Sequence, residues 1–204
     1  MEIVLATWNP RKIKMLMEEL MELPIQTRAL FSGEVDEVDE NGLTFEENAL
    51  LKANAVQLTS NRIVIAEDSG LCVDVLDGEP GVRTARWAPG TDDDRSLKLL
   101  KKLKHVYNPP LRNARFMSVI VIRFPDGSSS VTYGKLEGRI AFSPRGELAS
   151  GYSRIFELPS GLTIAEKGSP TIEINDHHRQ ALAKATECIK EWLIAQEARG
   201  VSID

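Results

Sequence analysis

The segment from residue 7 to residue 12 has the composition of a phosphate-binding turn. A short apolar run precedes it, and Asn9 followed by Pro10 is typical of a helix start. Helix starts attract anions, and a bound anion would explain why the cations Arg11 and Lys12 lie there. The alternative is a capped helix whose basic residues are simply hydrated. The residues assigned to this site are Thr7, Trp8, Asn9, Pro10, Arg11 and Lys12.

Two acidic segments have the composition of a divalent-cation site. One is the loop 34–40, which ends at Glu40 and is followed by Glu47; the other is Glu-Asp-Ser-Gly at 67–70. Magnesium prefers carboxylate oxygens, and ligands of open α/β sheets gather where strands end. Two adjacent carboxylates can hold a metal and activate a water. The alternatives are solvated acidic turns and, for Glu47, a helix-capping role.

Two further groups can contact a phosphate or a base. Lys52 either neutralises a phosphate or lies along a helix face. The segment 176–179, Asp-His-His-Arg, begins the last predicted helix and either contacts an anion or base edge, or is plain surface. Adjacent histidines point in different directions on a helix, so we expect no shared metal site there.

The apolar patterns place these residues at strand ends and helix starts. Early strand–helix alternation followed by a β-rich region predicts a mixed sheet. Thr44 and Glu47 fit a capping box, and Pro-Asp-Gly-Ser at 125–128 predicts a hairpin. We expect strands at 3–6, 63–66, 116–124, 130–133 and 138–142, and helices at 10–20, 44–59, 92–104 and 176–198.

The composition excludes several classes of protein. With 204 residues the chain suits one sizeable domain or two packed lobes, and a net charge of -5 argues against binding a nucleic-acid polymer. Only two cysteines occur, Cys72 and Cys188, and we expect them to be reduced. No apolar run is long enough to cross a membrane, and no signal-like segment opens the chain, so we expect a cytoplasmic protein.

Taken together, these segments resemble the Ham1 family of inosine/xanthosine triphosphate pyrophosphatases. The family's Thr-x-Asn-x-x-Lys motif stands at 7–12, and Gly-Leu-Thr-Phe-Glu-Glu-Asn-Ala at 42–49 with Lys52 following. Glu-Asp-Ser-Gly-Leu stands at 67–71 and a Gly-x-x-Ser-Ala-Arg-like element at 81–86. The order of these motifs along the chain makes the resemblance specific.

The resemblance implies an α/β fold that is elongated and two-lobed, with a central mixed β-sheet flanked by helices and a cleft between the lobes, formed by a single domain over 1–204. It implies a homodimer that uses magnesium. The implied activity is hydrolysis between the α and β phosphates of non-standard purine nucleoside triphosphates, which releases monophosphate and pyrophosphate and cleans the nucleotide pool.

The resemblance also assigns roles. Thr7, Asn9 and Lys12 would grip the triphosphate, and Ser69 would contact the substrate. Asp68 would orient or deprotonate the attacking water. The implied catalytic residues are Asp68, Lys12 and Lys52, and the implied metal ligands are Glu40 and Asp68, with Glu47 as the alternative second ligand.

The base-reading half departs from the family pattern. The family's Gly-Phe-Gly-Tyr-Asp-Pro reads here as Ala149 to Arg154, so a stacking Phe becomes Ser150 and an Asp becomes Ser153. The closing Lys position is Glu173, while His178 and Arg179 are retained. The base-side residues assigned to the substrate are Tyr152, Ser153, Arg154, Glu173, His178 and Arg179.

Because an unpaired polar partner is costly, these changes favour altered or relaxed base specificity. The alternative is an ordinary preference for inosine and xanthosine. Arg154 and Glu173 can pair with each other or read a different base edge. A non-catalytic nucleotide-binding module and a hydrolase of another phosphorylated metabolite are the competing functions.

Overall fold

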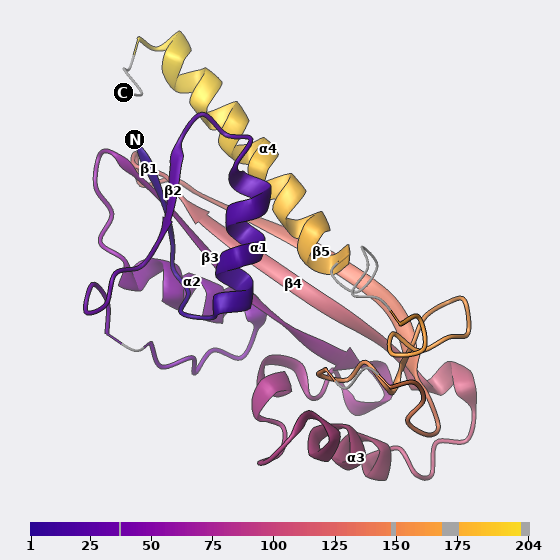
Figure 1. Ribbon diagram of the computed structural model, residues 1–204. Helices are drawn as coiled ribbons and strands as arrows, with labels where there is room; N and C mark the ends of the chain where they lie inside the picture. The colour runs from indigo at the N-terminus through magenta and orange to yellow at the C-terminus, as the bar shows by residue number, and fades with distance from the viewer. Residues whose placement is uncertain (37, 148–149, 169–175, 201–204) are drawn as a thin grey trace. The chain divides into compact units, whose positions relative to one another are not determined.

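The computed structural model describes the whole chain except residues 37, 148–149, 169–175 and 201–204 (Figure 1). The main elements are β1 (Glu2–Leu5), α1 (Pro10–Leu20), β2 (Gln26–Ala29), α2 (Phe45–Ala55), β3 (Arg62–Val73), α3 (Asp92–Lys102), β4 (Asn113–Arg123), β5 (Ser129–Ile140), β6 (Phe156–Glu157) and α4 (Asp176–Ala198). Short 3₁₀ helices cover Asp74–Leu76, Gly81–Arg86 and Pro109–Arg112. No helix among the described residues is long and apolar enough to span a membrane.

The strands form one sheet in the order β2-β1-β3-β4-β5-β6. β1 pairs in parallel with β2 and β3, with Leu5 opposite Ile65, whereas β6 pairs antiparallel with β5. The predicted α/β class with a mixed sheet is therefore confirmed. The predicted hairpin is also confirmed, because the Phe124 amide donates to the Ser128 carbonyl (2.9 Å) between β4 and β5.

Two strand predictions were wrong in extent. β3 continues through Val73 instead of ending before the carboxylates at 67–68. β5 is one strand from 129 to 140, where two separate strands were expected. Gly138 looks like a break in sequence, but its role is packing: a Cβ there would lie 2.5 Å from the Glu157 carbonyl oxygen of β6.

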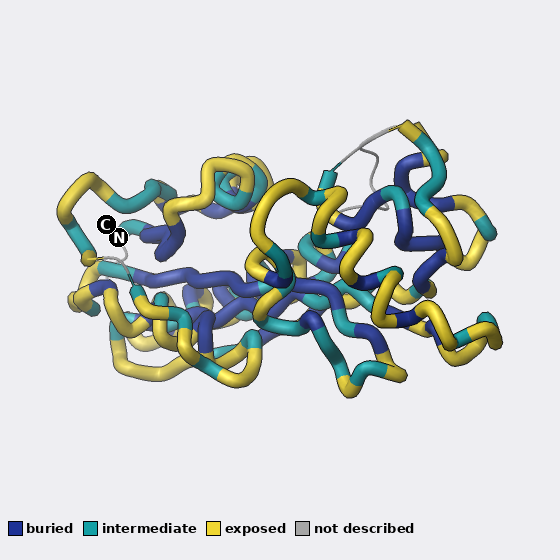
Figure 2. The backbone as a smooth tube through the Cα atoms, turned by 90° about the horizontal axis from the view of Figure 1, so that it is seen from below, coloured by how far each residue is buried: buried dark blue, intermediate teal, exposed yellow. Residues whose placement is uncertain are grey.

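The chain divides into two compact units, and β3, β4 and β5 each contribute residues to both. Unit 1 contains residues 1–68, 118–134 and 178–204, and unit 2 contains residues 69–117 and 135–177. In Figure 2 the sheet strands are largely dark blue, while the connecting loops are mostly yellow or teal.

Unit 1 has two hydrophobic cores, one on each face of its part of the sheet. The first, the α1–α4 core, includes Ile63 and Ile65 of β3 together with residues of α1 and α4. The second, the α2 core, includes Val64 and Ala66 of β3 together with residues of α2. Figure 1 shows α1 and α4 side by side in front of these strands and α2 behind them.

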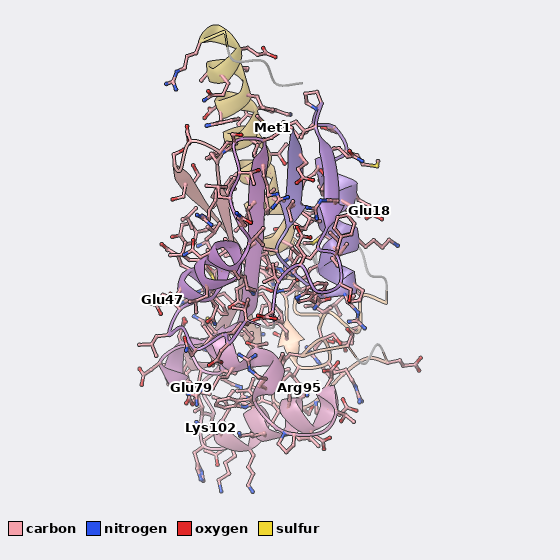
Figure 3. The ribbon with its side chains drawn as sticks, turned by 90° about the vertical axis from the view of Figure 1, so that its left-hand side faces the viewer. Met1, Glu18, Glu47, Glu79, Arg95 and Lys102 are labelled. Carbon is pink, nitrogen blue, oxygen red and sulfur yellow. The ribbon has the colours of Figure 1, made fainter. Side chains whose placement is uncertain are left out.

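Unit 2 has its own core, which joins α3 to parts of β3, β4, β5 and β6. Arg112 is 2% exposed there and satisfies its guanidinium by donating to four carbonyl groups. These belong to Leu103, Val106, Ile140 and Ala141. Because a buried cation without acceptors would be costly, this arrangement fixes the end of α3 against β5. Figure 3 labels Arg95 and Lys102, which mark α3.

Candidate active site

The turn before α1 is held by the side chains that the sequence singled out. The Asn9 Oδ1 accepts from the backbone N–H groups of Arg11 (3.0 Å) and Lys12 (3.4 Å), so Asn9 is the predicted N-cap. The Thr7 Oγ1 accepts from the Asn9 amide (3.2 Å). No acidic residue lies in the first turn of α1. The helix start is therefore electropositive, with Trp8 and Arg11 exposed beside it.

Strand alternation sends the two adjacent carboxylates of β3 to opposite faces of the sheet. Successive side chains of a strand point to opposite faces, and Ile65 lies in the α1–α4 core while Ala66 lies in the α2 core. Glu67 therefore continues the face covered by α1 and α4. Asp68 continues the face covered by α2.

Glu67 has no exposed side-chain surface and gathers three partners. The Lys12 Nζ lies 2.6 Å from its Oε2, and the His178 Nδ1 lies 3.2 Å from its Oε1. The Ser118 hydroxyl donates to the same Oε1 (2.8 Å). Burial alone would raise the pKa of Glu67, but the Lys12 charge and His178 hold that pKa well below its usual range.

Lys12 is held as a cation by the same contact. Its side chain is 20% exposed. Burial lowers the pKa of Lys12, but the charge and hydrogen bond of Glu67, followed by the charges of Asp68 and Glu40, raise it overall. The ammonium at the start of α1 is therefore permanently charged at neutral pH.

Asp68 lies between a neutral donor and a second lysine. Its Oδ2 accepts from the Asn48 Nδ2 (3.2 Å), and its Oδ1 lies 3.5 Å from the Lys52 Nζ. The same Lys52 Nζ lies 3.5 Å from the Glu40 Oε1, which brings the acidic loop to the end of α2.

Burial raises the pKa of Asp68, the charges of Lys52 and Lys12 lower it, and the charge of Glu40 raises it again. The net direction is upward. The charges of Lys52 and Lys12 both act on Asp68, so Lys12, Lys52 and Asp68 form one electrostatic cluster.

The loop that carries Glu40 is fastened to α2 through Gly42. The Gly42 amide donates to the Asn48 Oδ1 (2.8 Å), and Asn48 is fully buried. A Cβ at Gly42 would lie 2.7 Å from the same Asn48 oxygen, so only glycine allows this close approach. Asn48 therefore links the acidic loop to Asp68.

The donor set fits one magnesium ion better than a metal centre made of protein alone. Among the described residues, no three Asp, Glu, His or Cys side chains group closely enough to hold a metal by themselves. Glu40 and Asp68 are two carboxylates that share one neighbouring ammonium. Magnesium usually takes one or two carboxylates and completes its octahedron with water and substrate phosphate.

Glu47 is placed differently from the other two candidate ligands. Its Oε2 accepts from the backbone amides of Leu43 (2.6 Å) and Thr44 (3.3 Å), which confirms the predicted capping box. In Figure 3 it lies at the outside of α2. The capping contacts favour a structural role for Glu47, which leaves Glu40 as the better partner for Asp68.

The base-side residues of unit 2 make contacts within that unit. The Tyr152 hydroxyl donates to the Thr84 carbonyl (3.0 Å), and the Ser153 Oγ accepts from the Ser150 amide (3.2 Å). The Arg154 Nη1 lies 3.3 Å from the Asp93 Oδ2, and its Nε donates to the Gly146 carbonyl. Arg154 therefore pairs with Asp93; the proposed partner Glu173 lies outside the described residues.

Two further residues predicted to contact the substrate are Arg179 and Ser69. The Arg179 Nε lies 3.7 Å from the Glu19 Oε1 of α1, and both side chains are largely exposed. Ser69 is half-buried in β3.

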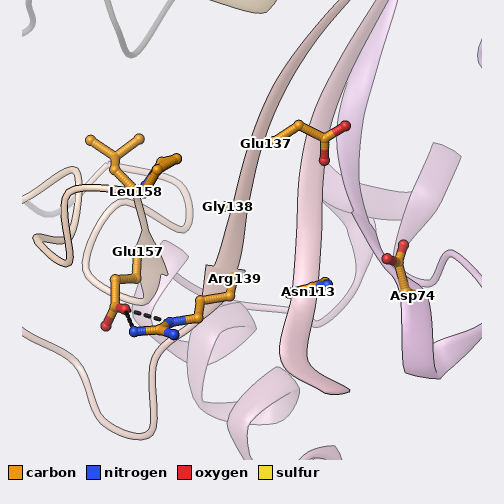
Figure 4. Close-up of a pocket in the computed structure, with 8 residues that line it drawn as sticks. Asp74, Asn113, Glu137, Gly138, Arg139, Glu157 and Leu158 are labelled. Atoms are coloured by element: carbon orange, nitrogen blue, oxygen red, sulfur yellow. Dashed lines mark hydrogen bonds and ion pairs between the residues drawn. The ribbon is translucent and has the colours of Figure 1, made fainter. Parts of the chain in front are cut away.

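A separate pocket of about 320 Å³ lies in unit 2 and contains none of the predicted site residues (Figure 4). Asp74, Asn113 and Glu137 contribute to its lining, and an ion pair between Arg139 and Glu157 lies in its wall. Three acidic residues and a single arginine line it, so the charged cluster of unit 1 is the better candidate for binding phosphate.

The sequence predictions missed three residues of the cluster: Asn48, Glu67 as an individual site residue, and Ser118. A signal existed for Glu67, because two adjacent carboxylates in a β3 segment buried on both faces require partners on both faces. Asn48 carried a weaker signal, one helical turn before Lys52. Ser118 carried none, since a serine within an apolar strand is common.

The fold and the site together define an α/β protein with a mixed sheet, in which an electropositive helix start meets a cluster of paired carboxylates and lysines. The family model for the Ham1 family matches residues 3–188. The chain belongs to the Ham1 family.

Two similar proteins and one solved structure span nearly the same length. A protein of Halalkalibacterium halodurans named "Non-canonical purine NTP pyrophosphatase homolog" is 41% identical, with 95% of this chain and 98% of the relative covered. A "dITP/XTP pyrophosphatase" of Symbiobacterium thermophilum is also 41% identical, with coverage of 91% and 93%. The solved structure of a HAM1 protein from Coxiella burnetii has a TM-score of 0.83 and 34% identity, covering 94% of this chain and 99% of its own.

Proposed function

We propose that this chain is a nucleoside triphosphate pyrophosphatase that converts non-standard purine triphosphates, such as those of inosine and xanthosine, to monophosphate and pyrophosphate. The relatives named as dITP/XTP pyrophosphatases support this substrate class. The observation that carries the proposal is the single electrostatic cluster of Lys12, Lys52 and Asp68 beside the start of α1.

The cluster supplies the groups that triphosphate hydrolysis requires. The two ammonium groups and the N–H groups at the start of α1 bind and orient the phosphates, and they stabilise the negative charge that develops on the leaving pyrophosphate. The Asn9 amide and the Thr7 hydroxyl add neutral donors at the same turn. Positioning and charge stabilisation account for most of the catalysis of such reactions.

Asp68 is the group that receives the proton. Water attacks the α-phosphorus, the bond from that phosphorus to the bridging oxygen breaks, and the proton of the water passes to the Asp68 carboxylate. Before an ion binds, burial raises the pKa of Asp68, which makes its carboxylate a better proton acceptor than that of an exposed aspartate. The Asn48 amide donates to the Asp68 Oδ2, and the Lys52 ammonium lies beside the Asp68 Oδ1. Together they orient the carboxylate.

Glu40 and Asp68 would hold a magnesium ion. When bound, such an ion neutralises phosphate charge and makes a coordinated water more acidic. We also propose a homodimer that works in the cytoplasm, where nucleoside triphosphates are used. Size-exclusion chromatography with light scattering and cell fractionation test these two proposals.

A panel of triphosphates tests the activity. The protein is incubated with magnesium and the triphosphates of inosine, deoxyinosine, xanthosine, adenosine and guanosine in ¹⁸O-labelled water. We expect pyrophosphate from the first three at rates at least about tenfold above the last two, with the label in the monophosphate. Label in pyrophosphate, or release of orthophosphate, would place the attack on a different phosphorus. Thermal stabilisation by nucleotides without turnover would instead indicate a non-catalytic binding module.

Two lysines of α1 provide a matched pair of variants. Lys12→Met removes the ammonium that contacts Glu67, whereas Lys14→Met removes one that is 79% exposed and lies 3.8 Å from Glu18. We expect kcat/KM to fall about a hundredfold in the first variant and to remain within about twofold in the second. Equal effects of the two substitutions would contradict the assignment of Lys12 to the phosphates.

A further inference from the structure

Glu67 is the most enclosed charged group of the cluster, and the proposed chemistry gives it no contact with substrate or metal. Its three partners come from three different elements: Lys12 from α1, Ser118 from β4 and His178 from α4. One carboxylate therefore joins the helix start that faces phosphate to the helix that carries the retained His178 and Arg179.

The contact with Lys12 restricts where its ammonium can point. An ammonium has three N–H donors, and the 2.6 Å contact with the Glu67 Oε2 occupies one of them. Because the side chain is only 20% exposed, few other rotamers are open to it. Glu67 thus orients Lys12 and leaves its other donors for phosphate.

The contact with His178 favours one of the two ring nitrogens as the site of the proton. A carboxylate 3.2 Å from Nδ1 favours a proton on that nitrogen, since two acceptors facing each other would repel. In the neutral ring Nε2 is then an acceptor. The His178 side chain is 16% exposed, so this preference is not averaged away by free rotation in water.

We propose that Glu67 is a positioning residue that couples Lys12 to His178: its buried carboxylate orients the ammonium of the first and holds a proton on Nδ1 of the second. The kinetic part of this inference rests on the proposed function. The His178 part does not, because it is a property of the protein without substrate.

The substitution Glu67→Gln tests the coupling to Lys12. It keeps the shape of the side chain and removes its charge, and we expect kcat/KM to fall about thirtyfold. Glu2→Gln is the matched control, since Glu2 is an ion-paired carboxylate in contact with Arg28 and Arg62 at the other end of β1. We expect kcat and KM of that control to change by less than about twofold.

A double-mutant cycle separates positioning from general weakening of the fold. If Glu67 acts through Lys12, adding Glu67→Gln to Lys12→Met should lower kcat/KM by less than about threefold more. A full additional thirtyfold loss would show that the two residues act independently and would overturn this part of the proposal.

Nitrogen NMR of the imidazole rings tests the coupling to His178 and requires no turnover. The chain has three histidines, and the His178→Gln variant assigns the signals. In the wild-type protein at neutral pH we expect a proton on Nδ1 of His178. An unprotonated Nδ1 would overturn this part of the proposal, even if Glu67→Gln failed to fold. If the wild-type protein hydrolysed no triphosphate but showed this proton, the proposed function would fail while the His178 contact would stand.

Discussion

The charged cluster of unit 1 and the segment Tyr152–Arg154 of unit 2 were both assigned to the substrate, yet their polar groups are satisfied in different ways. In unit 1, the charges of Lys52 and Lys12 both act on the buried Asp68 of β3. In unit 2, Tyr152, Ser153 and Arg154 bond to backbone groups or to Asp93 within their own unit.

This difference separates two kinds of polar residue. Burying several charged side chains close together costs stability because each loses its hydration. Such clusters with shifted pKa values are typical of functional sites. Polar groups that bond to nearby backbone instead stabilise a loop conformation. We therefore expect substitutions of the charged residues in the unit 1 cluster to affect turnover more than stability, and those in the Tyr152–Arg154 segment to do the reverse.

The largest effect should come from Asp68→Asn. This change removes the proposed proton acceptor, and turnover should fall by about a thousandfold or more. Because the pKa of Asp68 is raised, its ionised form is disfavoured in the fold, so a neutral residue of the same shape should leave the melting temperature unchanged or higher. Turnover and thermal unfolding measured on the same sample check both points. Full activity would remove Asp68 from the mechanism.

Gly42→Ala should have a smaller effect on turnover than Asp68→Asn. The added Cβ would lie 2.7 Å from the Asn48 Oδ1, so the acidic loop or Asn48 must move, with a loss of about 1–3 kcal/mol in the free energy of unfolding. We expect about a tenfold loss of kcat, since Asn48 also holds Asp68.

Gly33→Ala serves as its control in the same unit. Gly33 has a φ of 79° but open space around it, so alanine there should cost about 1 kcal/mol of stability without loss of turnover. Equal kinetic effects of the two alanines would show that the Gly42 contact has no part in positioning Asp68.

Arg154→Ala should lower the stability of the fold only slightly and should leave base selectivity nearly unchanged. The guanidinium contacts Asp93 and the Gly146 carbonyl, so its loss should cost about 1 kcal/mol or less. The ratio of kcat/KM for inosine triphosphate to that for guanosine triphosphate should change by less than about threefold. A tenfold change in that ratio would show that Arg154 contributes to base recognition. It would contradict the contrast drawn here between the Tyr152–Arg154 segment and the charged cluster of unit 1.

The last prediction concerns an ion pair of unit 1 outside the cluster, where no effect on turnover is expected. The hydrogen bond from Arg28 lowers the pKa of Glu34 from 4.5 to about 2. Because the pKa of Glu34 is lower in the folded than in the unfolded protein, its charge stabilises the fold when the pH is above 4.5. This contribution is lost as the pH falls from 4.5 towards about 2.

Glu34→Gln should therefore lower the free energy of unfolding by about 1 kcal/mol at neutral pH, with no change in turnover. The difference from the wild-type protein should vanish as the pH falls towards 2, which denaturant unfolding at a series of pH values measures. A difference that persists at low pH would mean that packing, and not charge, accounts for the role of Glu34.

Much of the fold followed from local patterns. Asn9 with Pro10 and the Thr44–Glu47 capping box were confirmed, because capping depends on residues close in sequence. The continuation of β3 past residue 66 was missed, because polar residues usually end a buried strand. Here other segments supply the partners that offset the burial of the two carboxylates. Glu67 contacts Lys12 and His178, and Asp68 contacts Lys52. The contact between Arg154 and Asp93 was missed for the same reason, since the two lie 61 residues apart.

The opposite orientation of Glu67 and Asp68 also limits how this chain can change over evolutionary time. Inserting or deleting one residue between Ile63 and Glu67 would exchange the two side chains, turning Glu67 towards α2 and Asp68 towards α1. Each lysine would then meet the wrong carboxylate. The length of this stretch is thus expected to stay fixed among functional descendants, while loops elsewhere gain and lose residues freely.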